Sequence, residues 1–143
     1  MSKVIHLSNE AHGLAKQYCK SKGLKMSVVV YDPFLSEERA NAIGAEKVDL
    51  EALYARADFI TVHTPLVEAT RNLIDKSAIN KMRDGVRIIN CARGGIVNEI
   101  DLREALESGK VAGAAFDVFV DEPAEKNPLF GHQEFIATPH LGA

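Results

Sequence analysis

The sequence of 143 residues has no excess of positive charge and no long hydrophobic run. Lysine and arginine number 17 against 20 acidic residues, and the net charge of −3 argues against nucleic acid or an anionic membrane surface as a partner. The apolar runs are much shorter than the about 20 residues that cross a bilayer, and the first residues lack the apolar core of a secretory signal. Hydrophobic residues nevertheless make up 46% of the chain, which is enough for one domain with its own core.

Cysteine is also scarce. The two cysteines, Cys19 and Cys91, lie far apart and match no metal-ligand spacing, so we expect no metal site. Free thiols are the simplest interpretation of both, and they predict a protein of the reducing cytoplasm. The chain contains no internal repeat and no low-complexity segment.

Short apolar stretches alternate with amphipathic segments along the whole chain. Strands are expected at residues 4–7, 28–31, 59–62, 86–89, 111–116 and 135–137. Helices are expected at residues 10–22, 37–42, 50–57, 76–82 and 99–108, with Ser36, Asp49 and Asn98 as caps of three of them. Nearly continuous apolar strands that alternate with helices indicate an α/β domain with a mostly parallel sheet covered on both faces. With right-handed crossovers this becomes a doubly wound, three-layer α/β/α domain that spans residues 1–143.

Polar residues follow the predicted strands at the same end. They are Asp32, His63-Thr64, Asn90 to Arg93, Asp117 and His140. Because the carboxyl ends of parallel strands meet at one edge of a sheet, these residues predict a ligand crevice. Arg93, which two glycines follow, places a positive charge at the end of a buried strand. This costs free energy unless an anion binds there.

Four long motifs resemble the NAD-dependent D-2-hydroxyacid dehydrogenases. They are DFITVHTPL at 58–66, RIINCARGGIV at 87–97, GAAFDVFVDEP at 113–123 and TPHLGA at 138–143. The resemblance begins near Met26, and the four motifs appear in the same order as in the family. Within the family, the sequence is most similar to the branch that acts on 3-phosphoglycerate. It implies a Rossmann-type dinucleotide-binding domain, and an activity that transfers hydride between NAD and a 2-hydroxy acid.

The resemblance also implies catalytic roles for three residues. Arg93 corresponds to the arginine that holds the carboxylate and carbonyl of a 2-oxo acid, a task that suits a planar fork of donors. His140 corresponds to the acid–base that exchanges a proton with the 2-hydroxyl, and Glu122 to the carboxylate that pairs with it. Without the resemblance, Glu122 before Pro123 also suits a solvated acidic turn.

The cofactor residues follow from the same resemblance. Asp32 would accept hydrogen bonds from the adenosine ribose and favour NAD over NADP, although an aspartate before Pro33 also suits a turn. The residues that would line the nicotinamide side are Thr64, Cys91 and Ala92, with Asp117 near the carboxamide. Arg93 beside Cys91 is expected to lower the pKa of that thiol, although hydride transfer needs no nucleophile.

The phosphate-binding loop departs from the family pattern. Without a gap, the three glycines of Gly-x-Gly-x-x-Gly fall on Asn9, Ala11 and Leu14. With a shift of one residue they fall on Ser8, Glu10 and Gly13, so only Gly13 is retained for cofactor binding. The missing glycines normally let the backbone approach the pyrophosphate, and Glu10 places a carboxylate in that region. We therefore expect NAD binding to be weak or absent.

Residues 1–25 differ in character from residues 26–143. The segment 4–15, with Ser8, His12 and Gly13, resembles the strand–loop–helix of fold-type II pyridoxal-phosphate enzymes, but no catalytic lysine motif is present. This change predicts a grafted first unit in an engineered or chimeric chain, with natural divergence as the alternative.

The family's substrate domain is expected to be absent. Arg93, Glu122 and His140 would then face solvent, so we expect no dehydrogenase turnover, and self-association through the exposed interdomain surface. The alternative interpretation is an engineered Rossmann-like protein with no ligand. Apart from a dinucleotide, we expect no nucleic-acid or membrane partner.

Overall fold

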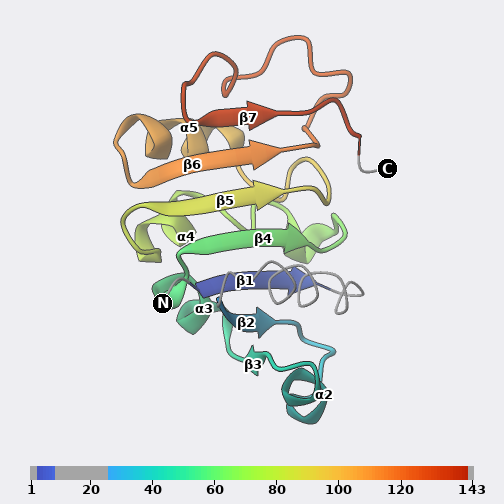
Figure 1. The fold of residues 1–143 in the computed structure, drawn as a ribbon. Helices are drawn as coiled ribbons and strands as arrows, with labels where there is room; N and C mark the ends of the chain where they lie inside the picture. The colour runs from blue at the N-terminus through green and yellow to red at the C-terminus, as the bar shows by residue number, and fades with distance from the viewer. Residues whose placement is uncertain (1–2, 9–25, 142–143) are drawn as a thin grey trace.

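A parallel sheet of seven strands forms the centre of the molecule (Figure 1). The computed structural model describes residues 3–8 and 26–141. The strands are β1 (Lys3–Ser8), β2 (Ser27–Tyr31), β3 (Glu46–Lys47), β4 (Phe59–His63), β5 (Val86–Asn90), β6 (Val111–Phe116) and β7 (Phe135–Ala137). Their order is β3-β2-β1-β4-β5-β6-β7, and every neighbouring pair is parallel. The predicted doubly wound sheet is confirmed, and its winding direction reverses between β1 and β4.

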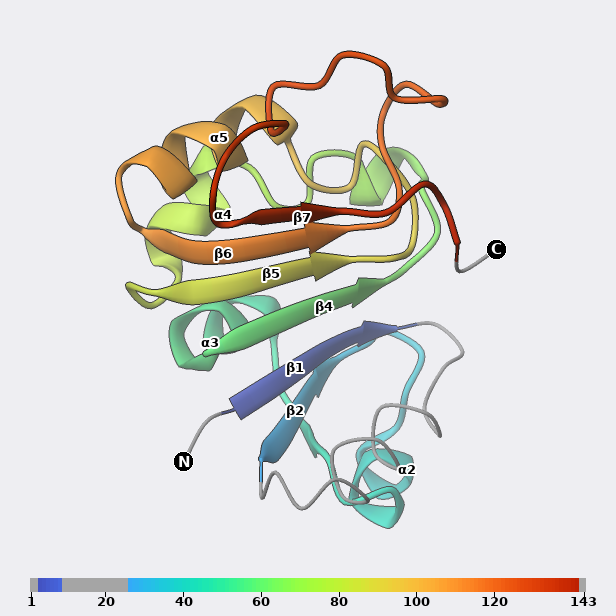
Figure 2. The ribbon, with the colours of Figure 1, turned by 45° about the horizontal axis from the view of Figure 1, so that its top comes forward.

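Helices lie on both faces of this sheet. They are α2 (Glu37–Ala42), α3 (Leu50–Arg56), α4 (Lys76–Lys81) and α5 (Glu99–Glu107), with a short 3-10 turn, η1 (Glu68–Thr70). Helices α3, α4 and α5 cover one face (Figure 2). Alternation along β2 shows how the layers form, because Val29 packs into the core beneath α3 whereas Val30 packs beneath α2. The result is the expected three-layer arrangement.

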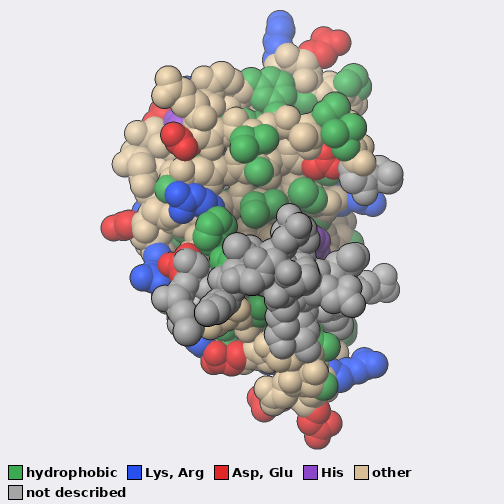
Figure 3. Space-filling view, viewed as in Figure 1, with side chains coloured by type: hydrophobic (Ala, Val, Ile, Leu, Met, Phe, Trp, Pro, Cys, Tyr) green, Lys and Arg blue, Asp and Glu red, His purple; other side chains and the backbone are tan. Residues whose placement is uncertain are grey.

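Apolar side chains come to the surface on the face opposite α3–α5 (Figure 3). A shallow cavity of about 270 Å³ lies there, and Phe59, Ile89, Ala115 and Ile136 line part of it. Ile136 on the edge strand β7 is 66% exposed. Among the described residues, this face of the sheet therefore carries exposed apolar side chains on its edge strand.

The three predicted caps begin helices as expected. The side chains of Ser36 and Asp49 accept hydrogen bonds from the third backbone N–H of α2 and α3, at 3.2 and 2.7 Å. The Asn98 side chain accepts from the N–H groups of Ile100 and Asp101, both at 3.1 Å. Each cap supplies an acceptor to backbone donors that have no partner inside the helix.

Two short elements were not expected from the sequence. Strand β3 has only two residues, Glu46 and Lys47, and exists because β2 offers it a parallel partner. The turn η1 is held by Thr70, whose hydroxyl donates to the Pro65 carbonyl at 2.6 Å. Neither element carries an apolar period in its own sequence.

Several predictions fall on residues 9–25, outside the described ranges. They are the helix at 10–22, the altered glycine loop with Gly13, and most of the segment that resembles pyridoxal-phosphate enzymes.

Candidate active site

The polar residues at the strand ends gather along one edge of the sheet. The parallel register aligns Ser8 with His63, Val62 with Asn90, and Phe116 with Ala137. The segments that follow these strands therefore leave the sheet side by side. This edge also contains the reversal of winding between β1 and β4, where open α/β sheets bind their ligands.

The turn that carries Arg93 is shaped by Asn90, which is 1% exposed. Its Oδ1 accepts a hydrogen bond from the Ala92 N–H at 3.1 Å, and its Nδ2 donates to the Arg93 carbonyl at 3.0 Å. The Arg93 side chain is exposed, and its Nη1 donates to the Ala92 carbonyl at 2.6 Å. The buried Asn90 side chain thus fixes the backbone of the turn, while the Arg93 guanidinium is exposed. The sequence singled out Asn90 only as a polar strand end and missed this role.

Glycine at position 94 is required by the neighbouring loop. A Cβ atom there would lie 1.8 Å from the carbonyl oxygen of Phe119, and the atom it would strike is backbone. Gly95 has a positive φ of 80°. The Arg93 turn is therefore packed directly against the loop that carries Glu122.

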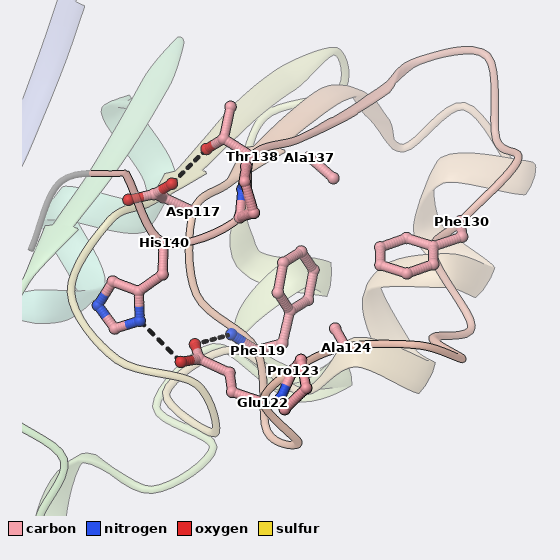
Figure 4. A pocket seen from close by; sticks show the side chains of 10 residues that line it. Asp117, Phe119, Glu122, Pro123, Ala124, Phe130, Ala137, Thr138 and His140 are labelled. Atoms are coloured by element: carbon pink, nitrogen blue, oxygen red, sulfur yellow. Dashed lines mark hydrogen bonds and ion pairs between the residues drawn. The ribbon is translucent and has the colours of Figure 1, made fainter.

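Glu122 and His140 form the pair that the resemblance predicts (Figure 4). His140 Nδ1 lies 2.7 Å from Glu122 Oε2, so the ring carries its proton on that nitrogen and donates it to the carboxylate. The Phe119 N–H donates to the other oxygen, Oε1, at 3.0 Å. These two donors, the Phe119 N–H first and then His140, hold the pKa of Glu122 below its ordinary value. The second ring nitrogen of His140 is directed away from Glu122.

Asp117 fixes the segment that bears His140. This buried carboxylate accepts hydrogen bonds from the Thr138 hydroxyl and, at 2.8 Å, from the Leu141 N–H. It therefore ties the end of β6 to both sides of His140. The sequence placed Asp117 near the cofactor but gave Thr138 no role, since a threonine before a proline carries no signal of its own.

A cavity of about 550 Å³ lies beside the pair (Figure 4). Asp117, Glu122 and His140 line its polar part, and Phe119 and Phe130 contribute to its apolar wall. Three of the residues predicted for the site thus share one cavity. Arg93 is not among the residues that line this cavity.

The remaining predicted residues follow other strands of the same edge. Asp32 is 1% exposed, and its Oδ1 accepts a hydrogen bond from the Phe34 N–H at 2.8 Å. Thr64 is half-buried after β4, and Ala92 is buried after β5. Cys91 is exposed, but desolvation and then the Asp117 carboxylate raise the pKa of its thiol. The expectation that Arg93 lowers this pKa is wrong, because burial and the Asp117 carboxylate set its direction.

Among residues 26–141, whose side chains the structure describes, no three His, Cys, Asp or Glu side chains gather in a way that would hold a metal ion. In the same part of the chain, no helix combines the length and apolarity needed to cross a membrane.

Comparison with known proteins agrees with this geometry. Residues 15–142 match the family model described as "D-isomer specific 2-hydroxyacid dehydrogenase, NAD binding domain". The doubly wound sheet is therefore an NAD-binding domain, and the chain belongs to the D-2-hydroxyacid dehydrogenase family, as the motifs predicted.

The chain is similar to D-3-phosphoglycerate dehydrogenases. It is 54% identical to the enzyme of Bacillus subtilis (strain 168) over 124 residues, which are 87% of this chain and 24% of that protein. It is 47% identical to the enzyme of Archaeoglobus fulgidus over 141 residues, which are 98% of this chain and 26% of that one. The chain thus spans about a quarter of the length of these relatives. The predicted similarity to the phosphoglycerate branch is confirmed.

The fold is also shared with a solved enzyme. The apo structure of Rhodotorula graminis D-mandelate dehydrogenase superposes with a TM-score of 0.87 at 34% identity, covering 99% of this chain and 42% of that one. Because the Archaeoglobus match spans 141 of 143 residues, it includes most of the first 25 residues. The grafted origin of that segment stays a prediction.

Proposed function

We propose that this chain is the NAD-binding domain of an enzyme that interconverts a 2-hydroxy acid and a 2-oxo acid, of the class represented by 3-phosphoglycerate. The observation that carries the proposal is the His140–Glu122 pair, which lies at the same sheet edge as Arg93. An imidazole held by a carboxylate on one nitrogen has the other nitrogen available for proton exchange. The exposed guanidinium of Arg93, at the same sheet edge, can bind a carboxylate through two parallel hydrogen bonds.

The roles of these residues follow from their chemistry. Arg93 binds the carboxylate of the 2-oxo or 2-hydroxy acid and orients C2. His140 exchanges a proton with the oxygen on C2, through the ring nitrogen that Glu122 does not hold. Glu122 fixes the tautomer and stabilises the charged ring when the proton is on it. NAD, when bound, supplies the acceptor for the hydride from C2.

The residues of the sheet edge suit this cofactor. Asp32 is a buried acceptor at the end of β2, beside the reversal of winding, and would hold the adenosine ribose hydroxyls. Thr64, Cys91 and Ala92 would line the nicotinamide side, with Asp117 near the carboxamide. A second phosphate on the ribose would meet the Asp32 charge, which favours NAD over NADP.

Binding by these 143 residues alone should be weak. Only Gly13 of the three expected glycines is retained, and Glu10 adds a negative charge where the pyrophosphate would lie. Turnover by the same chain alone should also be undetectable, because Glu122 and His140 are each about one-third exposed. Water then competes for the proton and the 2-oxo acid is not enclosed.

The substrate site can be tested by NMR titration with NADH and 3-phosphohydroxypyruvate. We expect the His140 ring signals to shift with the 2-oxo acid, and Arg93→Ala to remove the shift. Arg87→Ala is the matched control, since Arg87 is an exposed arginine on β5 away from the turn. An unchanged His140, or equal binding by Arg93→Ala, would contradict the assignment.

The loss of two glycines also favours a second interpretation, a Rossmann-type protein of engineered or chimeric origin that binds no ligand. It predicts no saturable response to NADH at any concentration. A separate proposal concerns the apolar surface around Phe59, Ile89, Ala115 and Ile136, on the sheet face opposite α3–α5. We expect this surface to drive self-association. Sedimentation velocity over a range of concentrations tests this, and a constant monomer would contradict it.

A further inference from the structure

Glu99, in the first turn of α5, binds two separated points of the loop between β6 and β7. Its Oε1 accepts a hydrogen bond from the Val120 N–H at 3.0 Å, and its Oε2 accepts from Asn127 Nδ2 at 2.8 Å. The two contacts lie on either side of Glu122 in the sequence. The Glu99 carboxylate therefore joins the two ends of the segment that carries Glu122.

At the end of this segment nearer β6, two consecutive backbone N–H groups donate to two different carboxylates. The Phe119 N–H donates to Glu122, and the next N–H, that of Val120, donates to Glu99. A rotation that freed one of these donors would move the peptide plane beside the other. The orientation of the Phe119 N–H toward Glu122 thus depends on the bond between Val120 and Glu99.

The far end of the segment is anchored in the core. Asn127 Oδ1 accepts a hydrogen bond from the Leu129 N–H at 3.0 Å, which fixes the amide so that Nδ2 points to Glu99. Leu129 is fully buried. On the other side, the absence of a Cβ at Gly94 lets the Arg93 turn contact the Phe119–Val120 backbone. Glu99 thus joins α5 to a loop that is already held at its base.

We propose that Glu99 is a positioning residue for the Glu122–His140 pair: by holding Val120 and Asn127 it keeps Glu122 where it meets both the Phe119 N–H and the imidazole. Its meaning for catalysis rests on the proposed function. Its structural action does not, because both contacts of Glu99 are made with groups of this chain.

The test is an NMR comparison of the ligand-free chain with Glu99→Ala. We expect the pKa of Glu122, followed through its side-chain carboxyl carbon, to rise toward its ordinary value as the Phe119 N–H leaves it. Exchange of the Phe119 amide hydrogen should accelerate by about tenfold. Glu99→Gln keeps an acceptor oxygen for the Val120 N–H but turns its amide N–H2, a donor, toward the donor Nδ2 of Asn127, so its effect should be smaller. Asn127→Ala removes the hydrogen bond to Glu99 from the other partner, so it should resemble Glu99→Ala.

Glu104→Ala is the matched control, because Glu104 lies on the same helix and forms an exposed ion pair with Lys76 at 2.7 Å. It should leave the Glu122 titration unchanged. A Glu122 titration and a Phe119 exchange rate that do not change in Glu99→Ala would overturn the proposal. Equal changes in Glu104→Ala would also overturn it, since they would reflect a general weakening of α5. If Glu99→Ala does not fold, Asn127→Ala decides between the outcomes by the same readouts.

Discussion

At the scale of single residues, the charge on Glu122 is supported by donors from two different segments. The Phe119 N–H comes from its own loop, and His140 comes from the segment after β7. Both interactions are stronger with the ionised carboxylate than with the neutral acid, which is why the pKa of Glu122 is lowered. The contribution of Glu122 to the stability of the folded chain therefore depends on pH.

This leads to a prediction about stability. A group whose pKa is lowered by folding stabilises the native state above its unfolded pKa, and loses that contribution as the pH falls through its folded pKa. Glu122→Gln should therefore destabilise the chain at neutral pH, by about 1 kcal/mol or less because the pair is partly exposed. The difference from wild type should shrink at acid pH, as the pH falls below the ordinary glutamate pKa of about 4.3 and through the lower pKa of folded Glu122. Urea unfolding at both pH values measures it.

Glu125→Gln serves as the control, since Glu125 is exposed in the same loop. It should have little effect at either pH. A Glu122→Gln difference that is the same at neutral and acid pH would show that the ionised carboxylate contributes nothing to folding.

At the scale of elements, the site depends on the contact between the β5–α5 turn and the β6–β7 loop. Gly94→Ala should break this contact, because the added Cβ would lie 1.8 Å from the Phe119 carbonyl oxygen. We expect a loss of about 2 kcal/mol or more in the free energy of unfolding, measured by urea denaturation, and a shift of the Phe119 and Val120 amide signals. Gly113→Ala is the control, since its Cβ would have an ordinary contact of 3.4 Å. Equal stability of the two variants would contradict the packing described here.

The elements differ in how far the sequence could predict them. The caps Ser36, Asp49 and Asn98 act within three residues of themselves, so local pattern was sufficient. Strand β3 depends on a partner strand, and η1 on a hydroxyl that reaches back five residues. Both were therefore invisible to local periodicity.

The same distinction applies to the site. The strand-end residues were predictable because parallel strands share an edge. The 18-residue separation between Glu122 and His140 allowed their pairing to be inferred only through the family resemblance. The contacts of Glu99 with Val120 and Asn127, 21 and 28 residues away, had no signal in the sequence. The pKa of the Cys91 thiol was misjudged because burial and the approach of Asp117 are tertiary properties.

At the scale of the whole molecule, the chain combines an intact sheet edge with an altered phosphate loop. The edge holds Asp32, Arg93, Asp117, Glu122 and His140, and the family match identifies an NAD-binding domain. The loop sequence retains one of three expected glycines. These two features predict that the cofactor is recognised but held loosely, and that the adenosine end is discriminated by Asp32.

A fluorescence titration of the chain with NADH, repeated with NADPH, tests this most directly. We predict saturable NADH binding with a Kd between roughly 100 µM and 1 mM, and binding of NADPH that is at least about tenfold weaker. A nanomolar-to-low-micromolar Kd for NADH would contradict the prediction that the missing glycines weaken NADH binding. Equal binding of NADPH would contradict the role of Asp32, and no saturation up to millimolar NADH would contradict the account's central claim that this edge is an NAD site.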